Sequence, residues 1–331
     1  MLGITRVNTV DWGEKMNRIQ KKVIHSGLVM HHLETGTKGP KLVITANIHG
    51  DECIGFAVVV SLLERLPSLL KKGEVVLYPS LNPTGLRRMM RTYPEDGQDL
   101  NRLFPGDSQG SASQRHVHTI WSSIENYKPD LLFDLHTDSP LSIPYVILDR
   151  KISTTVSNTV LEEMEHLARH SGLTIVWEYR TPDYRRYKLE KSLSGTALNR
   201  LGIPSLTLEV GPRRFMDRDS ITIATEAVLS MMSARGMLNE EYQSSHQPVE
   251  GIWYRGNGPV THHAGVFVAS VCAGDRVERN QLLGKVYSST GVELEEIRSH
   301  FPALVLSLPA QCWVRELQSC STLALEVRPE P

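Results

Sequence analysis

The chain has 331 residues, of which 40% are hydrophobic, so it is long enough for a large core and for more than one domain. Its 36 basic and 37 acidic side chains leave a net charge of -1, which gives no general attraction to nucleic acids or membrane surfaces. The longest apolar run, at 53–63, is shorter than the ~20 residues that a membrane span needs. The four cysteines form no C-x-x-C pair and the N-terminus lacks a secretion-signal pattern, so we expect a cytoplasmic protein with reduced thiols.

Strand and helix patterns alternate through the first 240 residues or so. The predicted elements are a β-hairpin at 21–35 turning at Ser26-Gly27, a buried strand at 41–48, a helix at 52–66 ending near Pro67, a strand at 73–83, a helix at 113–127 with Ser113 as its N-cap, strands at 129–136 and SIPYVILD, a helix near 153–171, the strand LTIVWEY, a helix near 192–201, the strand IPSLTLEV, and a helix near 219–236 that stops at Gly236. This alternation predicts an α/β fold with helices on both faces of the sheet.

Two stretches depart from the alternation. Residues 84–112 are rich in Gly, Pro, Asp and Arg, and a loop of this length inside a compact domain is usually functional. After a polar linker at 239–248, short β-like runs separated by glycines predict a small β-rich domain. We therefore expect an α/β domain at 1–245 and a β-rich domain at 250–331.

His49 and Glu52 follow the predicted strand 41–48 directly, so they lie at its carboxyl end. Their His-x-x-Glu spacing puts both side chains on one short turn, where they could share a metal ion. Zinc takes nitrogen and carboxylate ligands, and catalytic sites with two His and one Glu leave a position for water. Alone the pair is a weak signal, because a chain with 13 histidines is expected to contain one such spacing by chance. The alternative is a strand that passes through a tight turn into a helix.

Two other predicted strands end in chemically active side chains. His136 ends the run LLFDLH, where a capping or core histidine is the alternative to a metal ligand, and Asp134 or Asp138 could orient it. Glu209 lies in the otherwise apolar run SLTLEV, where a buried carboxylate is costly unless it is paired or functional. Beside a metal-activated water, Glu209 could serve as general base and acid; the alternative is a salt bridge to an arginine at the sheet edge.

Arginines in the loop RTYPEDGQDLNRLFPG are candidates for binding a substrate carboxylate, because a guanidinium can donate two parallel hydrogen bonds to it. Arg102 and Arg91 are the candidates, and the alternative is a solvated basic loop. The basic, aromatic segment 178–192 could supply a lid tyrosine, Tyr184 or Tyr187, or be an exposed loop. Cys53 beside Glu52 is interpreted as a small core side chain.

The motifs NIHGDE, DLNRLFPG, DLHTD and TLEVGP occur in this order, and the set resembles the succinylglutamate desuccinylase/aspartoacylase family. That resemblance implies a zinc amidohydrolase with a metallocarboxypeptidase-like mixed central sheet and a C-terminal β domain that caps the cleft. The run GVFVASVCAGDRVERNQLLGKVYS further resembles a biotinyl/lipoyl hammerhead. No lysine stands at its swinging-arm position, so we predict no lipoylation.

The resemblance also implies a role for each candidate residue. One Zn²⁺ per chain is held by His49, Glu52 and His136; Glu209 is the general base; Asn101 and Arg102 hold the substrate carboxylate; Arg91, or else Arg87 or Arg88, polarises the scissile carbonyl; and Asn199 or Arg200 stands where some members carry a further carboxylate-binding arginine. The expected substrate is a small N-acylated amino acid or a related carboxylate. No nucleic-acid or membrane partner is expected, and a homo-oligomer is left open. The alternatives are a zinc carboxypeptidase acting on short peptides and a non-catalytic metal-binding protein.

Overall fold

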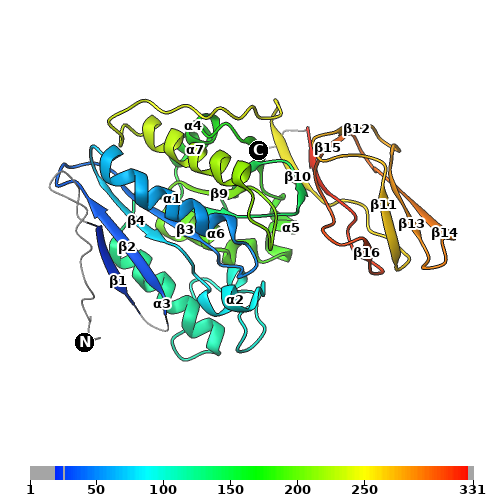
Figure 1. Ribbon diagram of the computed structural model, residues 1–331, viewed down its shortest axis with the longest axis horizontal. Coiled ribbons are helices and arrows are strands. Elements are labelled where there is room, and N and C mark those ends of the chain that lie inside the picture. Colours follow the sequence, from blue (N-terminus) through cyan, green and yellow to red (C-terminus); the bar gives the residue numbers. More distant parts are fainter. Residues whose placement is uncertain (1–18, 25–26, 327–331) are drawn as a thin grey trace.

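The computed structural model describes residues 19–24 and 27–326. Their strands form a large mixed sheet with helices on both faces and, toward the C-terminus, a smaller antiparallel sheet (Figure 1). The predicted fold class, an α/β mixed sheet with a C-terminal β-rich domain, is therefore confirmed. The hairpin predicted at 21–35 is present, although Ser26 of its turn lies outside the described residues.

The helices, in chain order, are α1 (Ile54–Leu69), α2 (Pro83–Arg88), the short η1 (Leu100–Arg102), α3 (Ala112–Tyr127), α4 (Asn158–His170), α5 (Thr181–Arg186), η2 (Leu189–Lys191), α6 (Leu193–Thr196), η3 (Ala197–Leu201) and α7 (Arg218–Ala234). The strands are β1 (Ile19–Val23), β2 (Val29–Glu34), β3 (Lys41–Ala46), β4 (Glu74–Tyr78), β5 (Leu131–His136), β6 (Leu141–Ser142), β7 (Tyr145–Leu148), β8 (Thr174–Trp177), β9 (Ser205–Glu209), β10 (Trp253–Gly256), β11 (Gly265–Ala269), β12 (Arg276–Val277), β13 (Leu282–Tyr287), β14 (Glu293–Arg298), β15 (Ala303–Leu308), β16 (Trp313–Val314) and β17 (Thr322–Leu325).

The large sheet has the strand order β1-β2-β4-β3-β5-β9-β7-β8-β10-β17-β15-β12, with β6 paired to β15. Strands β4, β3, β5 and β9 are parallel neighbours, so their carboxyl ends lie along the same edge. In this register His136, the last residue of β5, lies opposite Glu209, the last residue of β9. The topology thus assembles three strand ends that come from distant parts of the sequence, which is where ligands bind in sheets of this kind.

Two hydrophobic clusters fix the helices to the sheet. One packs α1, α4 and α7 against one face, and the other packs α3 and α6 against the opposite face (Figure 1). Most strands that form the centre of the sheet are fully buried, which explains their nearly continuous apolar sequences.

Some helix ends differ from the sequence prediction. Ser111, not Ser113, caps α3. Its hydroxyl oxygen accepts a hydrogen bond from the backbone N–H of Gln114, and the side-chain oxygen of Gln114 accepts one from the backbone N–H of Ser111. Helix α1 continues through Pro67 to Leu69, and it begins only at Ile54, so Glu52 lies in the turn before it. Gly236 has a positive φ just beyond α7, as predicted for its stop.

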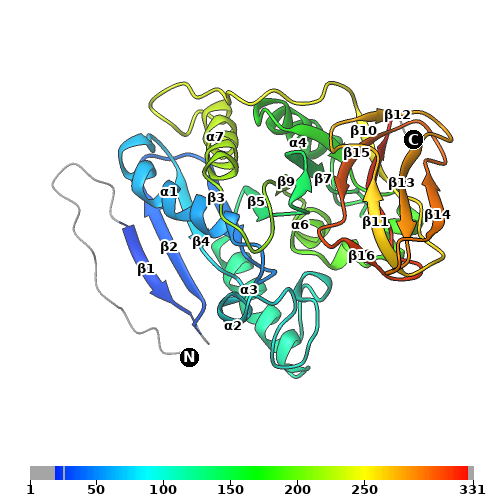
Figure 2. The ribbon, with the colours of Figure 1, turned by 45° about the vertical axis from the view of Figure 1, so that its right-hand side comes forward.

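The large sheet continues into the C-terminal part of the chain. Strand β10 pairs in parallel with β8 and antiparallel with β17, and the four-stranded sheet β14-β13-β11-β16 lies beyond it (Figure 2). The boundary predicted near residue 250 falls between α7 and β10 and stays a prediction. Among the described residues, no helix has the length and apolar character to cross a membrane.

Candidate active site

The turn after β3 is held by Asn47. The side-chain amide of Asn47 donates hydrogen bonds to the backbone carbonyls of His49 (2.9 Å) and Glu52 (3.0 Å), and the Ser80 hydroxyl fixes its oxygen at 2.6 Å. A side chain at Gly50 is excluded, because its Cβ would lie 2.1 Å from the carbonyl carbon of Gly85. The sequence NIHGDE therefore forms a tight turn that fixes both candidate ligands.

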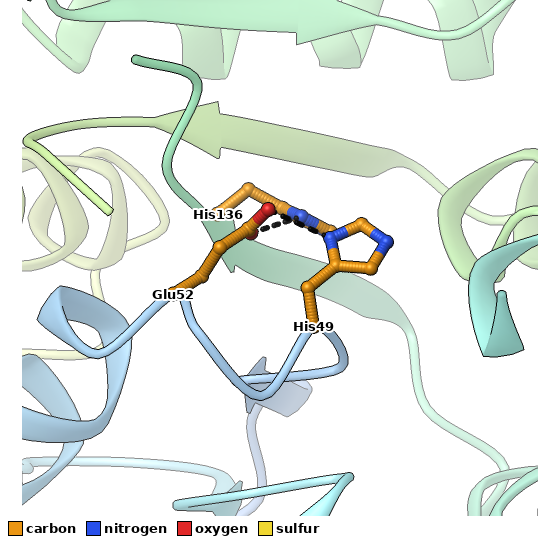
Figure 3. A group of neighbouring side chains, drawn as sticks. All are labelled: His49, Glu52 and His136. Atoms are coloured by element: carbon orange, nitrogen blue, oxygen red, sulfur yellow. Dashed lines mark hydrogen bonds and ion pairs between the residues drawn. The ribbon is translucent and has the colours of Figure 1, made fainter. Parts of the chain in front are cut away.

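His49, Glu52 and His136 converge at the carboxyl edge of the sheet (Figure 3). All three are buried, and one potential ligand atom from each lies within 4.8 Å of the others. The Nδ1 atoms of His49 and His136 lie 2.8 and 2.9 Å from the two oxygens of Glu52. Burial alone would raise the pKa of Glu52, but the charges of the two histidines hold it well below its ordinary value. The carboxylate is thus ready to act as a ligand.

Two carboxylates contact the second ring nitrogen, Nε2, of each histidine and so orient the rings. Nε2 of His49 lies 3.1 Å from Asp99, and Nε2 of His136 lies 2.8 Å from Asp134, which is itself fixed by the Thr45 hydroxyl at 2.7 Å. Metal-bound histidines are typically oriented by such a bond to the second ring nitrogen. With both Nδ1 atoms turned toward Glu52, the group offers two nitrogens and one carboxylate, a donor set that fits a catalytic zinc ion.

Replacing Asp134 with asparagine is expected to weaken zinc affinity by about 10-fold to 100-fold, because His136 loses the acceptor that orients it. Competition with a zinc indicator measures this change. Asp138→Asn is the control, since Asp138 instead accepts a bond from the Tyr145 hydroxyl at 2.9 Å. Equal affinities of Asp134→Asn and wild-type protein would show that Asp134 does not orient the ligand.

Glu209 is a further carboxylate at this edge of the sheet. It lies opposite His136 in the β5–β9 register, and its Oε2 is shielded from solvent without a hydrogen-bond partner among the described residues. Burial raises the pKa of Glu209 above its ordinary value. The negative charges of Glu52 and Asp138 raise this pKa further, whereas the positive charges of His136 and Arg255 lower it. A carboxylate whose pKa is shifted toward neutrality is suited to accept and return a proton.

Two arginines border the carboxylate of Glu52. Arg91 lies 3.1 Å from Glu52 and 3.3 Å from Asp99, and Arg213 lies 3.6 Å from Glu52 while it donates to the Thr137 carbonyl at 3.2 Å. By contrast, Arg87 and Arg88 are exposed. The structure therefore brings Arg91, and not its two alternatives, to the group.

Asn101 and Arg102 also reach the site. The Asn101 amide nitrogen lies 3.4 Å from Nε2 of His136, and its oxygen accepts the backbone N–H of Leu193 at 2.7 Å. Half-buried Arg102 donates to the Asn101 carbonyl at 2.7 Å. The loop at 84–112 is therefore tied to α6 by Asn101, one of the two residues for which the resemblance implied a substrate role.

Arg200 is not brought to this cluster. It is exposed on η3, and its side chain makes no hydrogen bond or ion pair with a described residue. The neighbouring Asn199 instead holds the loop at 150–153 through its amide, with bonds of 2.8–3.1 Å to Arg150, Ile152 and Ser153. The role implied for position 199 or 200 thus gains no support from the placement of either residue.

Two tyrosines hold the segment 178–192 against the rest of the protein, so the segment is not a fully exposed loop. Tyr184 is fully buried and donates to Asp149 at 2.7 Å, which excludes it as a surface lid, while half-buried Tyr187 donates to Asn257 at 2.8 Å. Asp149 is only 3% exposed. Burial, followed by the charge of Glu178, raises the pKa of Asp149 to about 7.

Asp149→Asn is expected to stabilise the protein at pH 8 by about 2–4 kcal/mol and to have little effect at pH 4. The raised pKa means that the folded state binds the proton more tightly, so the wild-type protein loses stability as the pH rises from about 4 to about 7. Asparagine keeps an acceptor for Tyr184 and removes the titration. Urea unfolding at both pH values tests this, with half-exposed Asp183→Asn as control; parallel pH curves for wild type and Asp149→Asn would contradict it.

Other residues of the site had weaker sequence signals. Asp99 directly precedes Leu-Asn-Arg in the loop motif, so its position in the motif was a signal. Arg213 follows the end of β9 by four residues, so its position near a strand end was a signal. Cys53 occupies the N-cap position of α1 without a capping hydrogen bond from its side chain. Its sulfur lies 3.9 Å from the Met89 sulfur, in agreement with a packing role.

Comparison with known proteins identifies the fold and the family. The catalytic-domain model of the succinylglutamate desuccinylase/aspartoacylase family matches residues 38–235, more than half of the chain. The chain belongs to this family. The matched range contains the candidate ligands His49, Glu52 and His136 together with Glu209, whereas β10 and the strands after it lie outside the range.

Similar proteins extend over most of the chain. The N-alpha-acetyl-L-2,4-diaminobutyric acid deacetylase of Halomonas elongata is 26% identical over 272 residues, which cover 79% of this chain and 75% of that protein. A solved aspartoacylase family protein from Mesorhizobium loti has a TM-score of 0.79 and 19% identity, with 99% of both chains covered. The product-bound ectoine utilization protein EutE of Ruegeria pomeroyi has a TM-score of 0.76 and 19% identity, with 97% of this chain and 98% of that chain covered. The solved structures show that the whole fold is shared.

Proposed function

We propose that this chain is a zinc-dependent deacylase that hydrolyses the amide bond of a small N-acylated amino acid in the cytoplasm. The observation that carries the proposal is the buried group His49, Glu52 and His136, oriented by two carboxylates, with Glu209 in register beside it. Family membership and the similarity to a deacetylase of an acetylated diamino acid support the reaction class. The four free cysteines are consistent with a reducing compartment.

The candidate ligands would hold one Zn²⁺ ion, which supplies Lewis-acid polarisation of the carbonyl and lowers the pKa of a water molecule. Glu209 takes the proton of the attacking water on its carboxylate and returns it to the leaving nitrogen. The Arg91 guanidinium offers positive charge to the developing oxyanion. Asn101 fixes the loop that carries Arg102, and Arg102 binds the carboxylate of the substrate.

A turnover screen tests this function. The zinc-loaded protein is incubated with N-acetyl and N-succinyl forms of aspartate, glutamate and 2,4-diaminobutyrate, and the released amine is measured. We expect hydrolysis of at least one N-acyl amino acid and slower hydrolysis of dipeptides that carry the same amino acid. Hydrolysis of dipeptides alone would favour a carboxypeptidase, and zinc binding without any hydrolysis would favour a non-catalytic metal-binding protein.

A further inference from the structure

Arg213 reaches the candidate metal group from the loop between β9 and α7. Its Nε donates to the Thr137 carbonyl at 3.2 Å and lies 3.6 Å from Oε1 of Glu52. The backbone N–H of Thr137 in turn donates to Oε2 of Glu52 at 3.1 Å. The next residue in the loop, Arg214, donates its backbone N–H to the Asp51 carbonyl at 2.8 Å. The loop is therefore anchored on the turn that carries two of the candidate ligands.

The two terminal nitrogens of Arg213 are available to a ligand. Within residues 19–24 and 27–326, neither Nη1 nor Nη2 donates a hydrogen bond, and both are open to solvent in a side chain that is 31% exposed. Arg91 differs, because its Nη1 lies 3.1 Å from Glu52 and its Nη2 lies 3.3 Å from Asp99. Of the two arginines that border Glu52, Arg213 is therefore the one whose donor fork can receive a carboxylate.

Arg213 and the loop at 84–112 approach the metal group from opposite faces of the sheet. Phe104 of that loop belongs to the hydrophobic cluster that packs α3 and α6. Val210, at the start of the loop that carries Arg213, belongs to the cluster that packs α1, α4 and α7. Figure 1 shows α7 and α3 on opposite sides of the sheet. A substrate that crosses the metal group with its amino-acid carboxylate at Arg102 therefore presents its acyl group toward Arg213.

We propose that Arg213 binds a carboxylate carried by the acyl group, so that the preferred substrates are amino acids acylated by a dicarboxylic acid such as succinic acid. This inference rests on the proposed function and deepens it by naming the acyl class. A guanidinium binds a carboxylate through two parallel hydrogen bonds, whereas a neutral acyl chain offers it no matching group. Arg213 is thus a specificity-determining residue on the acyl side, distinct from Asn101 and Arg102 on the amino-acid side.

A comparison of acid and amide ligands tests the inference. Calorimetry measures binding of the N-succinyl forms of aspartate, glutamate and 2,4-diaminobutyrate to the full zinc-loaded chain that carries Glu209→Gln to suppress turnover. The matched ligands are the N-succinamoyl forms, in which a neutral carboxamide replaces the acyl carboxylate. We expect at least one acid to bind about 10-fold to 100-fold more tightly than its amide. Adding Arg213→Gln should reduce this preference to less than about threefold, because the hydrogen bonds from the charged donor are lost.

Two further variants separate ligand binding from a structural role. Arg213→Lys keeps the charge beside Glu52 but not the planar fork, so an intermediate preference is expected even if Arg213→Gln fails to fold. Arg214→Gln is the matched control, because it removes the same charge one residue away, where the side chain is 63% exposed and lies 3.6 Å from Asp51. It should leave the preference within about twofold of the parent. A purely structural Arg213 would weaken acid and amide binding equally and leave their ratio unchanged.

The outcomes distinguish this inference from the proposed function. An unchanged acid preference in Arg213→Gln and Arg213→Lys, an equal loss in Arg214→Gln, or no preference in the parent protein for any of the three amino acids would overturn the inference. If the protein with native Glu209 hydrolyses N-acyl amino acids, the proposed function stands in that case. If no N-acyl amino acid is hydrolysed but the acid preference still depends on Arg213, the binding site stands and the deacylase function fails.

Discussion

Replacing Glu209 with glutamine is expected to lower kcat by about 10³-fold while the protein still binds its zinc. Glutamine keeps the size of the side chain opposite His136 but cannot take a proton from water or return one to the leaving nitrogen. The carboxylate is not one of the three grouped ligand candidates, so zinc content should stay at that of the wild type. Turnover of the substrate found in the screen and metal analysis of the same sample measure both quantities.

The control for this variant is Glu163→Gln on α4, where half-buried Glu163 pairs with Arg235 at 3.0 Å. Its kcat should stay within about twofold of the wild type, because Glu163 is not among the grouped ligands and does not contact them. Wild-type turnover in the Glu209→Gln protein would show that another group moves the proton. Loss of zinc together with activity would instead mean that Glu209 supports the metal.

Replacing His49 with alanine is expected to remove zinc binding and, with it, activity. The two remaining candidates, Glu52 and His136, leave an incomplete donor set, and the buried Glu52 loses one of the two partners that lower its pKa. The loss of affinity should exceed the roughly 10-fold to 100-fold expected for an orienting residue such as Asp134. Equilibrium dialysis against zinc measures the affinity directly.

Half-buried His246 provides the matched control, since it lies in the loop after α7 and is absent from the grouped ligands. His246→Ala should bind zinc like the wild type. If His49→Ala retained one zinc per chain with unchanged affinity, the metal would lie elsewhere and the assignment of the site would be wrong. If it lost zinc but kept full turnover, hydrolysis would not depend on that metal.

The candidate ligands could be found from sequence because their geometry is local. His49 and Glu52 lie on one turn, and His136 and Glu209 each end an apolar strand, so parallel strands bring them to one edge. Their role as ligands and as base stays a proposal, but their proximity follows from the fold class. The turn itself also explains why α1 starts later than predicted, since Asn47 binds the carbonyls of His49 and Glu52.

Residues that depend on long-range contacts were less predictable. Asp99 lies 50 positions from His49, and Arg255 lies 77 positions from Glu178, so no spacing within one element links either pair. Arg200 illustrates the opposite error: its position in the sequence matched an expected role within one residue, but the phase of η3 leaves it exposed. A shift of one residue rotates a side chain by about 100° on an α-helix, and on the π-helical turn η3 it likewise moves the side chain to another side of the helix.

The central claim is tested most directly by titrating the metal-stripped protein with zinc while the release of free amine from N-acyl amino acids is measured. The structure predicts that activity is absent without metal, rises in proportion to added zinc and saturates at one zinc per chain, the capacity of the His49–Glu52–His136 group. Amide hydrolysis that is independent of zinc, or the absence of hydrolysis at full zinc occupancy, would contradict the account.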